Sequence, residues 1–242
     1  MENALLVGLS AQMALRRNME IISNNLANAS TSGFKREAPV FEELMVPVDG
    51  DTSASKEISF VRDWGVVRDM TEGPLQQTGA PLDIAVEGTG FLIVRTAEGE
   101  RYTRDGHLKL DAQGRIVTSD GNPVLSDGGE ITIPPGGNDI KIASDGTVST
   151  AQGVAGKFRV VTFPPGAMKK EGGNLYSADA QPVPAENTRV MQGMIERSNV
   201  EAVVEMTKMI EVLRAYQHST ETLNATDDMI RRATQKLGEV KA

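Results

Sequence analysis

The stretch EMTKMIEVLRAYQHSTETL, residues 205–223, decides how this chain is organised. Its apolar side chains recur at steps of three and four residues, which predicts an amphipathic α-helix whose stripe must be buried. The pattern extends over residues 198–237, with a polar break at Asp227. Ser198 and Glu201 have the spacing of a capping box, so we expect the helix to begin there. The stripe consists of Ala202, Met206, Met209, Leu213, Tyr216, Thr220, Leu223, Ile230, Thr234 and Leu237.

A second amphipathic helix is predicted near the N-terminus, over residues 3–28. Its stripe is interrupted at Gln12 and consists of Leu5, Leu9, Leu15, Met19, Ile22 and Leu26. The spacing of Met209, Tyr216 and Leu223 is the 3.5-residue period of a coiled coil. Two such helices can bury their stripes against each other or against neighbouring copies. This layout favours a self-assembling filament subunit over an enzyme built round a pocket.

The middle of the chain has the pattern of β-structure. Residues 34–81 are punctuated by Pro and Gly, and we expect them to be extended or irregular. From Leu82 onward short apolar runs recur, and Asp-Gly pairs of the kind that make tight turns lie between them at 105–106, 120–121 and 145–146. The runs predicted as strands are 82–86, 91–94, 107–110, 115–117, 130–133, 140–142 and 158–161.

These patterns predict an α+β fold. The N- and C-terminal helices are expected to pair as a coiled coil, and a central all-β domain lies between them in sequence. The expected divisions are an N-terminal helix at 1–33, a connector at 34–81, the β-domain at 82–180, a linker at 181–197 and the C-terminal helix at 198–242.

Composition excludes several classes of protein. The net charge of the 242 residues is −8 and the basic pairs are short, so no nucleic-acid partner is expected. The absence of cysteine excludes disulfides and zinc–thiolate sites. No apolar run approaches the roughly 20 residues that cross a bilayer, so we expect no membrane span. The N-terminus lacks the basic region and apolar core of a cleaved secretory signal.

The sequence offers no catalytic constellation. Gly88-Thr89-Gly90 lacks the third glycine and following helix of a nucleotide loop, so a turn or bulge is expected there. His107 and His218 are the only histidines and have no neighbouring metal-ligand pattern. We therefore expect neither metal nor cofactor, and no enzyme activity. A hydrolase would need an acid–base set that cannot be assembled from these residues.

Four motifs resemble those of the bacterial flagellar rod and hook protein family, in family order over nearly the whole chain. The first is Ser23-Asn24-Asn25-Leu26-Ala27-Asn28 with Thr31-Ser32-Gly33-Phe34-Lys35. The second is Leu82-Asp83-Ile84-Ala85-Val86-Glu87-Gly88-Thr89-Gly90-Phe91, and the third runs from Tyr102-Thr103-Arg104-Asp105-Gly106 to Asp120-Gly121. The fourth is Gln192-Gly193-Met194-Ile195-Glu196-Arg197-Ser198-Asn199-Val200 with Met209-Ile210-Glu211-Val212-Leu213-Arg214-Ala215-Tyr216-Gln217.

Some segments of the sequence indicate which members of the family the chain resembles most. The opening residues 1–6, the segment 14–17 and the short length are most similar to proximal rod proteins. The distal rod protein remains an alternative because it is similar and usually only a little longer. Glu196-Arg197 departs from the small or acidic pair of many relatives, and we expect this to change local contacts only.

The resemblance implies where the subunit works and how it is exported. Rod subunits of this family are exported without a cleaved signal by the flagellar type III apparatus, and they assemble in the periplasm into the basal-body drive shaft. Their terminal helices form an inner tube and the β-domain packs outside it. Expected partners are other copies of the chain, neighbouring proximal and distal rod proteins, and the export apparatus during delivery. The candidate assembly residues are Leu5, Leu9, Leu15, Met19, Ile22, Asn24, Asn25, Leu26, Asn28, Gly33, Phe34, Met206, Met209, Leu213, Tyr216, Leu223, Ile230 and Leu237.

A second interpretation fits the Asn-rich stretch 23–28. From periodicity alone an ordinary helix end rich in Asn and Ser is favoured over a subunit contact, and the family resemblance reverses that preference. For the chain as a whole, the rival class is a surface adhesin or binding module with helical oligomerisation ends. Such a β-domain should expose aromatic side chains, but the only tryptophan, Trp64, lies outside residues 82–180.

Overall fold

The computed structural model describes residues 2–47, 57–137, 139–186 and 188–239. The chain divides into two units, each built from separate stretches of sequence. The helical unit comprises Met1–Ala27, Glu37–Asp69 and Glu201–Ala242, and the β-rich unit comprises Asn28–Arg36 and Met70–Val200. The predicted α+β class is confirmed.

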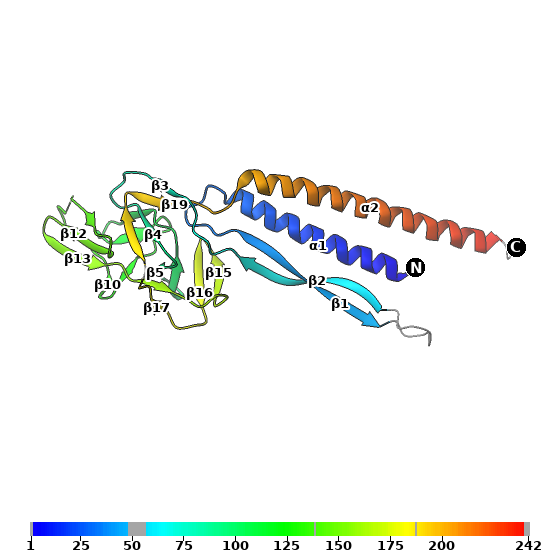
Figure 1. The fold of residues 1–242 in the computed structure, drawn as a ribbon, viewed down its shortest axis with the longest axis horizontal. Coiled ribbons are helices and arrows are strands. Elements are labelled where there is room, and N and C mark those ends of the chain that lie inside the picture. Colours follow the sequence, from blue (N-terminus) through cyan, green and yellow to red (C-terminus); the bar gives the residue numbers. More distant parts are fainter. Residues whose placement is uncertain (1, 48–56, 138, 187, 240–242) are drawn as a thin grey trace. The chain divides into compact units, whose positions relative to one another are not determined.

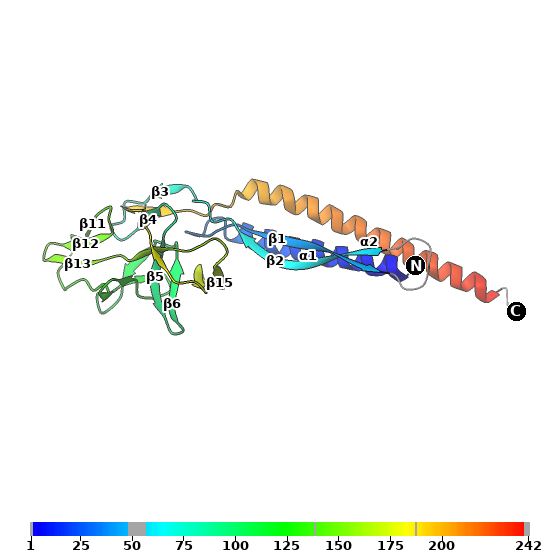
Figure 2. The same cartoon turned by 60° about the horizontal axis from the view of Figure 1, so that its bottom comes forward.

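Two helices dominate the helical unit, α1 Glu2–Ala27 and α2 Ala202–Glu239, and they lie side by side in both views (Figures 1 and 2). The Gln12 Nε2 atom donates to Thr220 Oγ1 at 2.9 Å, so the polar interruption of the first stripe is satisfied across the pair. The Leu223 side chain fills the space over Gly8. Residue numbers that increase along α1 therefore lie opposite residue numbers that decrease along α2. The predicted pairing of the helices is thus antiparallel.

The start of α2 differs from the predicted capping box. The helix begins at Ala202, and the Glu201 carbonyl accepts from the Glu205 N–H at 3.0 Å. Ser198 lies before the helix, where its Oγ accepts from the Val200 N–H at 3.2 Å. The hydroxyl closes a local turn instead of capping the helix, because a serine side chain can bond its own nearby backbone equally well.

The third part of the helical unit is a long β-hairpin of β1 Glu37–Pro47 and β2 Glu57–Arg68, which packs along α1 (Figure 2). The predicted connector thus contains a regular antiparallel ladder where extended or irregular chain was expected. Pro39 is tolerated because each strand of a two-stranded ladder is an edge strand. A bulge between Val40 and Phe41 lies opposite Gly65, whose φ is +145°.

The β-rich unit is built from short antiparallel strands. The largest sheet has six strands in the order β15-β16-β6-β5-β14-β17, and a three-stranded sheet has the order β11-β12-β13. The remaining strands form the pairs β9–β10, β4–β18, β3–β19 and β7–β8. The strands are β3 Leu75–Gln77, β4 Ile84–Glu87, β5 Phe91–Thr96, β6 Gly99–Thr103, β7 Leu108–Leu110, β8 Ile116–Thr118, β9 Leu125–Ser126, β10 Gly129–Glu130, β11 Lys141–Ile142, β12 Thr147–Thr150, β13 Gly153–Lys157, β14 Val160–Thr162, β15 Met168–Gly172, β16 Leu175–Ala178, β17 Val183–Pro184, β18 Arg189–Gln192 and β19 Met194–Glu196.

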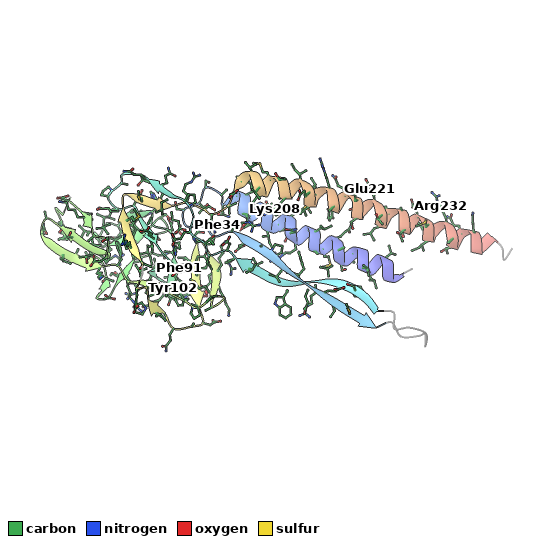
Figure 3. All side chains as sticks on the ribbon, viewed as in Figure 1. Phe34, Phe91, Tyr102, Lys208, Glu221 and Arg232 are labelled. Atoms are coloured by element: carbon green, nitrogen blue, oxygen red, sulfur yellow. The ribbon has the colours of Figure 1, made fainter. Side chains whose placement is uncertain are left out.

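The strands bury two apolar clusters. The larger cluster is aliphatic apart from Phe158. The smaller cluster combines aliphatic side chains with three buried aromatic rings. The rings of Phe91 and Tyr176 meet edge to face with centroids 5.9 Å apart, and Phe163 packs on Tyr102 with centroids 4.5 Å apart (Figure 3 labels Phe91 and Tyr102). The larger cluster consists of Ile84, Val86, Leu92, Val94, Leu108, Ile116, Val124, Ile131, Ile133, Ile140, Ile142, Val148, Phe158 and Val190.

This unit uses more of the chain than residues 82–180. Arg189–Gln192 pairs with β4, and Met194–Glu196 pairs with β3. Val183–Pro184 pairs with β14, so the stretch expected as a linker supplies three strands. They have only two to four residues, and each contains Pro or a polar side chain, so no apolar run marks them in the sequence.

Two of the three predicted tight turns are present. Gly121 and Gly146 have φ of +86° and +85°, as Asp-Gly turns require. Gly106 does not have a positive φ, so the turn predicted at Asp105-Gly106 is wrong. Its carbonyl instead accepts from the Ile84 N–H at 2.9 Å, and a Cβ on this residue would lie 1.6 Å from the Ile84 carbonyl oxygen. Glycine is present here because β4 passes directly over its backbone.

Candidate assembly surfaces

The candidate residues on the two helices fall on two different faces. One set lies on the paired faces: Ile22 is buried, and Leu5, Leu15, Met19, Leu26, Met209, Tyr216, Leu223 and Ile230 are half-buried. The other set points away from the pair: Leu9, Met206 and Leu213 are 51%, 45% and 44% exposed. Leu237 lies in α2, but its side chain is outside the described residues. On α2 the half-buried Val212 therefore lies at the interface with α1, whereas Leu213 lies on the exposed outer face.

The two asparagines of the N-terminal motif have different environments. Asn24 is exposed, whereas Asn25 is fully buried. The Asn25 Nδ2 atom donates to the Glu37 carbonyl at 2.7 Å and to Glu205 Oε2 at 3.1 Å, and its Oδ1 accepts from the Glu37 N–H at 2.9 Å. Asn25 therefore joins α1, the hairpin and α2 within the helical unit.

Replacing Asn25 by Ala is expected to destabilise the helical unit by about 2–3 kcal/mol, because it leaves the buried Glu205 carboxylate and the Glu37 backbone without this partner. The fluorescence of Trp64 in β2 reports on the unfolding of this unit. The urea concentration at the midpoint of that transition should be lower in the variant than in the wild type. Asn24→Ala is the matched control and should shift the midpoint far less. Equal shifts for the two variants would contradict the joining role of Asn25.

The remaining motif residues lie in the β-rich unit. Asn28 ends the first helix with a turn: its carbonyl accepts from the Thr31 N–H at 3.1 Å, and its Oδ1 accepts from Thr31 Oγ1 at 3.2 Å. Gly33 has a φ of +67°, and a Cβ there would lie 2.5 Å from the backbone of Arg104. Phe34 is 1% exposed. Gly33 and Phe34 are thus packed inside the subunit in this structure.

Next to Phe34 lies a buried ion cluster that sequence reasoning missed. Lys35 Nζ is 2.6 Å from Glu196 Oε1 and 2.6 Å from the Thr71 carbonyl. Arg104 Nη1 is 3.0 Å from Glu196 Oε2, and the Gly73 N–H donates to Glu196 Oε1 at 2.8 Å. Lys35, Arg104 and Glu196 are at most 3% exposed. Burial lowers the pKa of the Lys35 ammonium, and the Glu196 carboxylate opposes that shift.

The cluster shows what Glu196 of the Glu196-Arg197 pair contacts. Its carboxylate holds two cations and one backbone N–H from three other segments. All three charged residues lie inside the motifs that carry the family resemblance. That coincidence is the one sequence signal that could have identified the cluster, because each residue alone has the character of an ordinary surface charge.

The hairpin also exposes apolar side chains. Trp64 is 63% exposed, and the Arg62 guanidinium carbon lies 5.5 Å from the centre of its ring. The other exposed apolar residues of the hairpin are Val40, Phe41, Leu44, Met45, Val46, Val61 and Val67. Such a concentration of exposed apolar area indicates a surface that other proteins cover.

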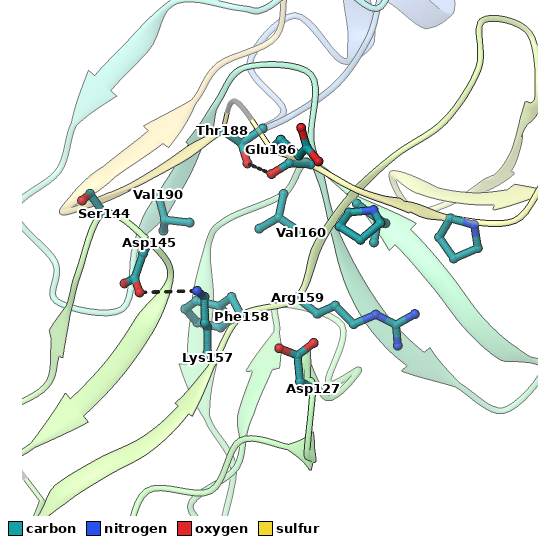
Figure 4. Close-up of a pocket in the computed structure, with 14 residues that line it drawn as sticks. Asp127, Ser144, Asp145, Lys157, Phe158, Arg159, Val160, Glu186, Thr188 and Val190 are labelled. Atoms are coloured by element: carbon teal, nitrogen blue, oxygen red, sulfur yellow. Dashed lines mark hydrogen bonds and ion pairs between the residues drawn. The ribbon is translucent and has the colours of Figure 1, made fainter.

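A pocket of about 380 Å³ lies in the β-rich unit beside β14 (Figure 4). Its lining is internally bonded: Lys157 Nζ is 3.4 Å from Asp145 Oδ2, and Thr188 Oγ1 donates to the Ala185 carbonyl at 3.1 Å. No histidine, the commonest general base, is among the described residues that line it. In the described part of the chain there is also no group of three His, Asp or Glu side chains placed to hold a metal ion.

Neither helix, over its described residues, is long and apolar enough to cross a membrane.

Comparison with known proteins identifies the family. Three family models match: "Flagella basal body rod protein" at residues 5–35, "Flagellar hook protein FlgE/F/G D1 domain" at 85–150 and "Flagellar basal body rod FlgEFG protein C-terminal" at 191–236. The flagellar basal-body rod protein FlgF of Caulobacter vibrioides is 41% identical over 251 residues, covering 99% of this chain and all of the relative. FlgF of Salmonella typhimurium is 32% identical, covering 98% and 99% of the two chains.

FlgG, another basal-body rod protein, is also similar: that of Buchnera aphidicola from Acyrthosiphon pisum is 36% identical over 94% of this chain and 96% of the relative. The similarity to FlgG does not exceed that to FlgF. Because these relatives match nearly end to end and the helix–β–helix order agrees with the matched segments, the chain belongs to the family of bacterial flagellar basal-body rod proteins and is a structural subunit of the rod.

Proposed function

We propose that the helical unit is the assembly module of this rod subunit. Copies of the chain and neighbouring rod proteins pack against its outer faces, and the resulting tube of helices carries torque as part of the drive shaft. The observation that supports this proposal is the set of large apolar side chains left exposed on both helices. They are Leu6, Leu9, Met13, Val203, Val204, Met206, Ile210, Leu213 and Met229.

The same proposal accounts for the apolar candidate residues on the two helices. Those on the paired faces hold α1 and α2 together, and those on the outer faces contact other subunits. Apolar area that is exposed in one subunit and buried in the assembly makes association stabilise the module, by about 25 cal/mol per Å² removed from water. The subunit is delivered by the type III export apparatus without a cleaved signal and works in the periplasm. It has no catalytic role.

Within the rod we propose the proximal position. The segments 1–6 and 14–17 support it, as does the FlgF relative that matches 99% of the chain. The FlgG-like distal position is the alternative.

Replacing Leu213 by Asp is expected to abolish swimming while leaving the monomer folded. Leu213 is 44% exposed, so the free energy of unfolding should change by only about 0.5 kcal/mol. In the assembled rod the new carboxylate would be buried against a neighbour at a cost of several kcal/mol. Swimming, export into the periplasm and rod content of basal bodies should be measured in cells that carry the variant as their only copy.

Gln217→Asp is the matched control, since Gln217 is exposed one turn further along α2. It adds the same charge at a position that is already polar, and the cells should swim. Normal swimming and complete rods with Leu213→Asp would contradict the assembly module. A variant that is degraded before export would report on folding, so the amount of exported protein must match the wild type.

A further inference from the structure

Two short apolar stripes on the outer faces of the helices are left largely exposed within the described chain. On α1 the stripe consists of Leu6, Leu9 and Met13, which are 53%, 51% and 67% exposed. On α2 it consists of Val203, Met206, Ile210 and Leu213, which are 73%, 45%, 52% and 44% exposed. Each stripe turns polar as it continues, at Arg16 and Glu20 on α1 and at Gln217 and Glu221 on α2 (Glu221 is labelled in Figure 3).

The two stripes have complementary spacing. From Leu6 the steps are three and then four residues, and from Leu213 back to Met206 they are again three and then four. Antiparallel helices meet with their residue numbers running in opposite directions, so the side chains can interdigitate as in a coiled coil. Leu6 then lies opposite Leu213, Leu9 opposite Ile210 and Met13 opposite Met206.

The stripes of one molecule cannot meet. Within the chain, Gln12 faces Thr220 and Asn25 faces Glu205. The α2 stripe therefore lies level with the C-terminal end of α1, about 12 residues away from the α1 stripe. At about 1.5 Å per residue, this separation is about 18 Å along the helix axis. Only a second molecule, displaced by that distance, brings the stripes together.

Opposite charges also come close together at one end of the proposed helix contact. One step of three beyond Met13, Arg16 comes level with Val203, and the exposed Glu201 lies two residues before Val203. The Arg16 side chain is 75% exposed, so it is free to extend toward a carboxylate on a neighbour in addition to its exposed contact with Glu20.

From the matched steps, the exposure, the offset and the charges, we infer that the occupant of each stripe is a second copy of this chain. The α1 helix of one copy docks antiparallel on the α2 helix of the next, in the register that sets Leu9 opposite Ile210. Each copy uses one stripe toward each neighbour, so the contact is head-to-tail and propagates instead of closing as a dimer. This inference rests on the proposed function of the helical unit.

The test uses the natural absence of cysteine, which makes introduced thiols the only ones in the chain. Two differently tagged copies, one carrying Leu9→Cys and the other Ile210→Cys, are produced in the same cells and oxidised in isolated basal bodies. The expected product is a disulfide-linked dimer that carries both tags. Its yield should exceed that of Leu9→Cys with Val203→Cys by about tenfold or more, because a disulfide needs Cβ atoms within about 4.5 Å.

The control pair distinguishes register from mere proximity. Val203 lies on the same stripe as Ile210 but two turns away, about 10 Å along the axis. Arg16→Glu should lower the yield of the Leu9–Ile210 product, and Arg16→Glu combined with Glu201→Arg should restore it. Gln12→Cys with Thr220→Cys in a single copy should give an internal crosslink and confirms that the helix pair has formed.

The outcomes separate the two proposals. If the chain is present in basal bodies but Leu9 and Ile210 give no more product than the control pair, or if Leu9 crosslinks only to other rod proteins, the docking register is wrong and the assembly module is unaffected. If the tagged chains form internal crosslinks yet are absent from basal bodies, the proposed function fails and the docking inference fails with it.

Discussion

Replacing Glu196 by Gln is expected to destabilise the β-rich unit by about 3–5 kcal/mol, because it leaves two buried cations without their counter-ion. Lys35 and Arg104 both contact this carboxylate, at 2.6 Å and 3.0 Å. The amide has nearly the same shape, so the loss arises from charge and not from a cavity. Amide hydrogen exchange of β5 in increasing urea reports on this unit without a signal from the helices.

Glu87→Gln is the matched control for this experiment, since Glu87 is exposed at the end of β4. It makes the same chemical change on the surface of the same unit and should alter the free energy of unfolding by about 0.5 kcal/mol or less. Adding Lys35→Met to Glu196→Gln should cost less than the sum of the two single changes, because one of the stranded cations is then gone. Strict additivity, or a Glu196→Gln variant as stable as the control, would show that the cluster does not hold the unit together.

Replacing Gly106 by Ala is expected to destabilise the β-rich unit by about 3 kcal/mol or more. The added Cβ would lie 1.6 Å from the carbonyl oxygen and 2.7 Å from the carbonyl carbon of Ile84. Both atoms belong to backbone, so no side-chain rotation relieves the contact and β4 must move away. That movement breaks the hydrogen bond from the Ile84 N–H to the Gly106 carbonyl and disturbs the larger apolar cluster, which contains Ile84.

Gly121→Ala provides the comparison for urea unfolding. Gly121 has a φ of +86°, but nothing lies within 4 Å of a Cβ there. Its replacement should therefore cost only the strain of a left-handed residue, about 1–2 kcal/mol. If the two alanine variants lose the same stability, the close approach of β4 is not what requires glycine at position 106.

The parts of the fold that could be predicted from the sequence are those with a long period. The helices α1 and α2 span 26 and 38 residues, so the three-and-four spacing repeats many times and identifies them within a few residues. The apolar runs predicted as strands each overlap a strand, because runs of three to five apolar or alternating residues stand out between the turn residues that flank them. The pairing of α1 with α2 could be predicted because each helix has an apolar stripe that must be buried against another surface.

The features that could not be predicted depend on contacts between distant residues. The hairpin of β1 and β2 looked irregular because Pro39, Pro47 and Gly65 break the strand pattern, although an edge ladder tolerates them. Leu9 and Leu213 matched the helical stripes, but spacing alone could not tell the paired face from the outer face of a helix with apolar residues on both. The positions of Gly106 and Glu196 depend on β4 and Lys35, which are remote in sequence.

The helical unit is made of three stretches, and its two helices are separated in the chain by every residue of the β-rich unit. When a chain emerges N-terminus first from a ribosome, α1 can pack against the hairpin of β1 and β2 early, but it has no helical partner until the residues after 200 arrive. The β-rich unit, in contrast, already has all its strands once Glu196 has emerged. Pairing of α1 with α2 is therefore the last long-range contact that can form, and it forms only when the residues of α2 are present. A chain that stops short can fold its β-rich unit, but it cannot form the paired helices on which the outer stripes are displayed.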